Sequence, residues 1–186
     1  MRCFVAVELD RTFRRHLLAV LEQLPRGRGV RWCGAHQLHV TLKFLGDVPD
    51  HQLPGICDAV SAAARQIEPF AVTLGRLGCF PNERNPRVLW CGIDDPEQGC
   101  ARWLAAADPL FGRLGLATDS RPLHPHITLG RSRSGEGSRL MQRALADVPG
   151  PPAATMPVEQ VVLFQSDLSP RGARYTPQFT APLGEA

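Results

Sequence analysis

A short alternating segment that occurs twice constrains the fold of this chain more than any other feature. From Leu38 to Leu45, apolar and polar residues alternate strictly, which is typical of a β-strand with one buried face. A second segment, His126 to Arg131, begins with the same His-x-Thr-Leu string. The two leading histidines, His39 and His126, lie close to half the chain length apart. The repeat predicts two similar halves that each bring one histidine to a shared site.

The solvated face of the first strand is expected to carry a histidine, a hydroxyl and a cation, namely His39, Thr41 and Lys43. Lys43 is the single lysine among 21 basic residues. Two interpretations are open: the lysine falls there by chance, or the position needs a compact ammonium that arginine cannot replace. Phe44 alternates inward, which favours a place in the core, although an aromatic ring at a strand end can also stack on a base.

The second copy needs one departure from strict alternation. Alternation places His126 and Thr128 on one face of the strand and Arg131 on the other. A bulge or bend at Gly130, or the reach of a long side chain, would return Arg131 to the face of His126. His124 shares that face, and we expect a surface residue there, with contact to a ligand as the alternative.

Two facing imidazoles suit in-line displacement at phosphorus. One neutral imidazole activates a water molecule and an imidazolium protonates the leaving oxygen, and each transfer typically contributes roughly 10²–10⁴-fold. The threonine hydroxyls and the cations would stabilise charge on the non-bridging oxygens. Metal ligation by His39 and His126 is the alternative, but no third ligand at metal spacing is evident.

Periodicity predicts an irregular order of helices and strands. We expect helices at residues 11–24, 54–67, 95–111 and 140–146. We expect strands at residues 2–8, 30–32, 38–45, 70–79, 87–93, 123–131, 158–165 and 174–181. Pro109 should kink or end the third helix, and the proline-rich segment 149–157 should be a linker. The order lacks regular βαβ repetition, which indicates the α+β class with antiparallel sheets.

Composition limits the class of protein. A hydrophobic fraction of 44%, a charged fraction of 21% and a net charge of +3 fit a globular protein without a strong nucleic-acid stripe. We expect one domain of two lobes over residues 1–186. Six cysteines without a C-x-x-C pair predict free thiols in a reducing cytoplasm. No apolar stretch approaches the ~20 residues of a membrane span, and the apolar start is too short for a signal peptide.

The two motif strands, with their flanks, carry a family resemblance. Leu38 to Gly46 and Arg121 to Arg131 resemble the signature strands of the two-histidine phosphoesterase superfamily. Within it, the chain is similar to the RNA 2′,3′-cyclic phosphodiesterases, once described as 2′-5′ RNA ligases. Three further segments look like that family: Arg2 to Val7, Arg87 to Trp90, and Ser166 through Tyr175.

The resemblance implies a bilobal α+β fold with pseudo-two-fold symmetry, in which helices flank two antiparallel sheets and the active site lies in the cleft between the lobes. It implies hydrolysis of 2′,3′-cyclic phosphates on RNA ends or nucleotides to 2′-phosphates, without metal or another cofactor. We expect a cytoplasmic monomer. The residue roles that it implies are catalysis by His39 and His126 and phosphate binding by Thr41, Thr128, Lys43 and Arg131. Gly130 departs from the alanine or other small residue expected there.

Two alternatives to hydrolysis stay open. One is 2′-5′ RNA ligase activity, which is the reverse of the same chemistry. The other is a non-catalytic module whose histidines only hold the phosphate of an RNA end or nucleotide. Turnover of a cyclic nucleotide would separate an enzyme from such a module.

Overall fold

The computed structural model describes residues 1–118, 121–169 and 172–184. Its helices are α1 (Arg11–Gln23), α2 (Leu53–Ala64), α3 (Gly99–Arg113) and α4 (Gly135–Asp147), with short 3₁₀ turns η1 (Ala35–Gln37) and η2 (Asp50–Gln52). Its strands are β1 (Arg2–Glu8), β2 (Val30–Trp32), β3 (His39–Asp47), β4 (Phe70–Phe80), β5 (Val88–Asp94), β6 (His126–Ser132), β7 (Thr155–Val158), β8 (Gln160–Ser169) and β9 (Gly172–Pro182). The predicted α+β class is confirmed.

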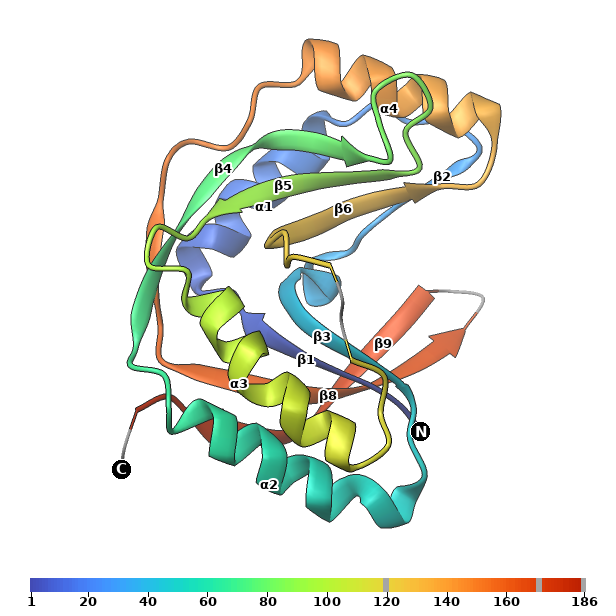
Figure 1. Ribbon diagram of the computed structural model, residues 1–186. Coiled ribbons are helices and arrows are strands. Elements are labelled where there is room, and N and C mark those ends of the chain that lie inside the picture. The colour runs from blue at the N-terminus through green and yellow to red at the C-terminus, as the bar shows by residue number, and fades with distance from the viewer. Residues whose placement is uncertain (119–120, 170–171, 185–186) are drawn as a thin grey trace.

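The described strands form one antiparallel sheet in the order β7-β4-β5-β6-β3-β1-β8-β9, with β2 paired to β6. We expected two separate sheets, and this was wrong because β3 and β6 pair at Val40 and Ile127. Figure 1 shows β4, β5, β6 and β2 gathered near α4, while β1, β3, β8 and β9 lie near α2 and α3. The two motif strands therefore lie at the centre of the sheet, where the two groups of strands meet.

Helices α1 and α4 begin at side-chain caps, and each buries one apolar stripe. The Asp10 carboxylate accepts a hydrogen bond from the Phe13 amide at 2.7 Å and starts α1, whose apolar stripe is buried. The Ser134 hydroxyl caps α4 in the same way. Helix α3 continues past Pro109 to Arg113, so the proline does not end it. Buried side chains on both sides of the proline, including Trp103 and Phe111 at 0% exposure, outweigh the lost backbone hydrogen bond.

Segment 149–157 is not wholly a linker, because β7 begins within it and pairs with β4. Met156 and Val158 are buried and alternate with exposed neighbours, as in a half-buried strand. Pro157 is tolerated because β7 is an edge strand of the sheet. Proline has no backbone N–H, and none is needed on the open side of an edge strand.

One core cluster runs from Cys3 to Leu183 and contains residues from both groups of strands. All six cysteines are free, which confirms that prediction. Burial raises the pKa of Cys33 to about 11 and that of Cys91 to about 12, so both thiols are protonated at neutral pH. Among the residues described, no helix has the length and apolarity that crossing a membrane demands.

Gly130 is a close-packing position in β6. A Cβ atom on Gly130 would lie 2.2 Å from Cε3 of Trp32, which belongs to the paired strand β2. The Trp32 indole N–H also donates to the Pro25 carbonyl at 3.1 Å, which holds the ring in place. In this chain the tryptophan explains why glycine replaces the alanine expected from the resemblance.

We predict that Gly130→Ala destabilises the protein by about 1–3 kcal/mol, because the indole must move to admit the methyl group. Chemical denaturation measures the change. Gly135→Ala is the matched control, since its Cβ would approach only Arg139 Nη1, at 4.0 Å. Equal unfolding free energies for Gly130→Ala and the parent protein would show that Trp32 does not restrict this position.

Candidate active site

The pairing of Val40 with Ile127 brings the two motifs together. Both side chains are buried, at 1% and 0% exposure, on the core face of the sheet. Extending this antiparallel register by one residue each way places His39 across from Thr128 and Thr41 across from His126. The predicted histidines and threonines therefore share one face of the sheet, with each histidine beside the threonine of the other motif.

The two motif strands carry the same irregularity. In the pairing of β3 with β1, and of β6 with β5, the register skips the leucine that follows the His-x-Thr string, Leu42 or Leu129. Each skip is a β-bulge, which turns the following residues to the other face. The first seven residues of both strands consequently show one burial sequence, in which the fifth residue is buried and the sixth exposed. The expected bulge is present one residue before Gly130, at Leu129, and Arg131 is exposed.

Lys43 occupies the buried fifth position, so strict alternation placed it on the wrong face. Its side chain is 1% exposed and its Nζ donates to Oδ1 of Asp108, on α3, at 2.7 Å. The first bulge causes this, because it turns Lys43 away from His39 and toward the helix. The expectation that Lys43 lies on the phosphate-binding face was wrong, and its side chain instead joins β3 to α3.

Phe44 occupies the exposed sixth position, equivalent to Arg131. Its side chain is 62% exposed, so the expected inward orientation was wrong for the same reason. Its ring lies 6.1 Å from the ring of Phe4, with which it pairs across β3 and β1. The bulge thus places an exposed aromatic ring beside the face of His39, as the stacking alternative requires.

His39 is held by two hydrogen bonds. Its Nδ1 donates to the Gln37 carbonyl oxygen at 2.8 Å, because a carbonyl can only accept. The neutral ring then carries its lone pair on Nε2, which lies 2.9 Å from the Thr41 hydroxyl. Phe4 and Tyr175 pack on the ring, with centroids 4.8 and 5.1 Å away. The contacts direct Nε2 along the polar face of the strand.

His126 is held by one hydrogen bond of the same kind. Its Nδ1 donates to the His124 carbonyl oxygen at 2.7 Å, again from the residue two positions earlier. The Nε2 atom is therefore the basic one in the neutral ring. Phe80 and Trp90 lie 5.1 and 6.0 Å from the ring, and the His124 ring lies against both aromatics.

Burial and neighbouring cations keep both imidazoles neutral at neutral pH. Burial lowers the pKa of His39 to about 4, with further lowering by the charges of His126, Arg14 and Arg131. Burial also lowers the pKa of His126, and His124 and Arg131 add to the effect. The arginines among these causes are Arg14 and Arg131 for His39 and Arg131 for His126. An anion bound beside them would favour the protonated imidazole.

The aromatic residues that surround the two histidines could not be predicted from the motifs. Phe4 and Tyr175 come from β1 and β9, and Phe80 and Trp90 come from β4 and β5. Strands β1 and β5 are the other neighbours of the two motif strands, so alternation within them would have placed Phe4 and Trp90 once the strand order was known. Asp108 lies on α3, and no periodic signal joined it to Lys43.

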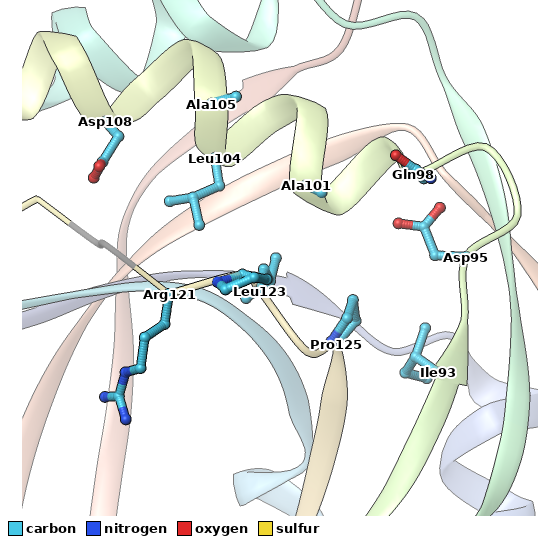
Figure 2. A pocket seen from close by; sticks show the side chains of 11 residues that line it. Ile93, Asp95, Gln98, Ala101, Leu104, Ala105, Asp108, Arg121, Leu123 and Pro125 are labelled. Atoms are coloured by element: carbon cyan, nitrogen blue, oxygen red, sulfur yellow. The ribbon is translucent and has the colours of Figure 1, made fainter.

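A cavity of about 520 Å³ lies between α3 and segment 121–125, which leads into β6 (Figure 2). None of the predicted site residues lies among the described residues that line it. Asp108 projects from α3 on the side facing this segment, whereas the Arg121 guanidinium points away from α3 (Figure 2). The cavity is a separate hollow beside the strand that carries His126. Over residues 1–118, 121–169 and 172–184, no group of three His, Cys, Asp or Glu side chains could hold a metal ion.

The buried ion pair gives a stability prediction. Asp108→Ala should destabilise the fold by about 3–5 kcal/mol, because it removes a carboxylate from a buried ammonium. The double variant Lys43→Met/Asp108→Leu should recover most of that loss, since no buried charge remains. Urea unfolding of the parent, the single variants Lys43→Met and Asp108→Leu, and the double variant completes the cycle. Purely additive losses would mean that the pair does not couple β3 to α3.

The lowered pKa of His39 gives a pH prediction. The pKa of His39 is near 6.5 in the unfolded chain and about 4 in the folded chain, so below pH 6.5 the unfolded chain binds a proton that the folded chain does not. The contribution of His39 to the free energy of unfolding is therefore fully present above pH 6.5 and is lost as the pH falls toward 4. Relative to the parent, His39→Gln should gain about 2–3 kcal/mol between pH 7 and pH 4. His36→Gln, at an exposed histidine, is the control. Parallel stability curves for the parent and His39→Gln would contradict the shifted pKa.

Comparison with known proteins agrees with this geometry. Residues 7–90 and 93–175 match the family of LigT like phosphoesterases. The RNA 2′,3′-cyclic phosphodiesterase of Methanothermobacter thermautotrophicus is 32% identical over 177 residues, which cover 95% of each chain. The structure of TT0787 from Thermus thermophilus is 31% identical, covers 100% of both chains and superposes with a TM-score of 0.77.

The structure of E. coli LigT complexed with 3′-AMP is 25% identical, covers 99% of this chain and 98% of its own, and gives a TM-score of 0.80. The family match spans almost the whole chain, includes both motif strands, and is supported by a relative above 30% identity. The chain belongs to the family of LigT like phosphoesterases.

Proposed function

We propose that this chain hydrolyses 2′,3′-cyclic phosphate ends of RNA to 2′-phosphates, with His39 and His126 as the acid–base pair. The observation that carries the proposal is the paired register around Val40 and Ile127, which sets two imidazoles with the same tautomer on one face of the sheet. Relatives along most of the chain's length are named RNA 2′,3′-cyclic phosphodiesterase, which supports the substrate class.

The proton route follows from the tautomers. Nε2 of one histidine takes a proton from water as the water oxygen bonds to phosphorus. Nε2 of the other, in its protonated form, gives a proton to the 3′ oxygen as the phosphorus–oxygen bond breaks. Both pKa values are lowered in the free site, and the negative charge of the bound phosphate favours the imidazolium that the acid role requires.

Three residues are placed to hold the non-bridging oxygens. Thr41 and Thr128 lie on the histidine face, and Arg131 returns to it after the bulge in β6. Hydroxyl and guanidinium donors stabilise the charge that develops on these oxygens. Lys43 has no part in this arrangement, because it faces α3 and bonds to Asp108.

An exposed aromatic ring on β3 is available to stack on the base of the RNA end. Phe44 is 62% exposed and occupies the position equivalent to Arg131. Stacking of a base on such a ring is worth roughly 1–3 kcal/mol and accepts any base. The phosphate would therefore be held toward β6 and the base toward β3.

The scheme requires no metal, since nucleophile activation, leaving-group protonation and charge stabilisation are all assigned to side chains. The test is hydrolysis of a 2′,3′-cyclic mononucleotide in EDTA, with products separated against 2′- and 3′-phosphate standards. We expect full activity and the 2′-phosphate alone. His39→Gln and His126→Gln should each lose roughly 10²–10⁴-fold in kcat.

The exposed His36→Gln variant is the matched control and should keep full activity. Circular dichroism of each variant establishes that the fold is intact. Activity that disappears in EDTA and returns with zinc or magnesium would contradict the side-chain mechanism. Binding without turnover would favour the non-catalytic module, and a 3′-phosphate product would overturn the assigned leaving group.

A further inference from the structure

A second arginine stands directly opposite Arg131. Strand β2 pairs with β6, and the register sets Arg31 against Arg131 and Trp32 against Gly130. Both arginines are exposed. Residues directly opposite in an antiparallel pair project from the same face, with Cβ atoms about 4.5–5.5 Å apart. Arg31 therefore lies on the face of the histidines, on the edge of β6 that also pairs with β3.

The backbone under this arginine pair is firmly held. On the opposite face, the Trp32 ring covers Gly130 so closely that a Cβ atom there would lie 2.2 Å from it. The Cys33 amide donates to the Leu129 carbonyl at 2.8 Å and extends the β2–β6 ladder toward the bulge. The backbone of β2 at Arg31 is therefore fixed relative to β6.

The charge of Arg131 reaches the centre of the site. It contributes to the lowering of the pKa of both His39 and His126, and it also lowers the pKa of Tyr175 against the larger effect of burial. Arg31 adds a second guanidinium directly opposite Arg131. Two arginines on neighbouring strands, Arg131 on β6 and Arg31 on β2, therefore lie beyond the imidazoles on one face of the sheet.

We propose that Arg31 is the binding residue for a second phosphate, the phosphodiester that precedes the terminal nucleotide of an RNA end. The inference rests on the proposed function of the histidine site, with the terminal phosphate at the imidazoles and Arg131 beside Arg31 on the neighbouring strand. A guanidinium is suited to this contact because its planar fork binds phosphate oxygens through two hydrogen bonds. The protein then selects polynucleotide ends over free cyclic nucleotides.

Three substrates isolate this contact: a 2′,3′-cyclic mononucleotide, a dinucleotide ending in the same cyclic phosphate, and that dinucleotide with a neutral methylphosphonate linkage. Arg31→Gln should lower kcat/KM for the charged dinucleotide by about 10- to 100-fold, as expected for one lost charge-assisted hydrogen bond. The mononucleotide and the methylphosphonate should change less than twofold. For the charged dinucleotide, the slope of log(kcat/KM) against log[salt] should weaken by about 0.7.

Arg139→Gln is the matched control, because Arg139 is exposed on α4, which packs against the core side of β6. It should behave as the parent on all three substrates, and Arg31→Lys should retain part of the preference. Equal losses on the mononucleotide and the dinucleotide would overturn the proposal, since Arg31 would then act through Arg131 or the fold. No loss on any substrate would overturn it as well.

A binding readout separates this proposal from the proposed catalysis. Fluorescence anisotropy with a labelled dinucleotide ending in a 2′-phosphate measures the second contact without turnover. Arg31→Gln should weaken this binding about tenfold or more, and the methylphosphonate analogue should bind both proteins equally. If the parent hydrolyses no cyclic phosphate but this difference persists, the proposed hydrolysis fails and the phosphate subsite stands. Equal binding of the charged dinucleotide by both proteins would refute the subsite.

Discussion

The pairing of Val40 with Ile127 is the contact on which the candidate site depends. It joins two groups of antiparallel strands into one sheet, and its two buried side chains anchor the junction to the core. Outward from this junction the strand order is β3-β1-β8-β9 on one side and β6-β5-β4-β7 on the other. Without the pairing, each histidine would belong to a separate strand face with no fixed relation to the other.

The bulges beyond this junction decide which residues meet a ligand. Each bulge turns the fifth residue of its strand inward and the sixth outward. The residue at the inward position differs between the two copies. In β6 the residue is Gly130, and the Trp32 ring fills the space of the missing side chain. In β3 the residue is Lys43, and burial of its ammonium is compensated by Asp108. The same backbone feature is thus filled in two ways, by a glycine under the Trp32 ring or by a lysine paired with Asp108.

Much of the fold and half of the site could be predicted from sequence, because period-two alternation and the repeated His-x-Thr-Leu string are local signals. The order of the strands and the positions of Phe4, Tyr175 and Asp108 could not, since they depend on which strands become neighbours. The error at Lys43 had a different origin. A bulge was allowed in the second motif to return Arg131 to the site, but strict alternation was kept in the first. Aligning the two motifs residue by residue would have turned Lys43 inward and Phe44 outward.

The scaffold repeats, but its chemistry does not. Equivalent positions after the two bulges present a phenyl ring from β3 and a guanidinium from β6. The cations that shift the histidines include Arg131 but no charged counterpart at Phe44. Under the proposed function, a nucleotide with its phosphate between the imidazoles would meet charge on one side and an apolar ring on the other. Because the two orientations of such a ligand differ in energy, a repeated fold can hold it in one direction, and in-line attack at phosphorus then selects one of two chemically similar oxygens.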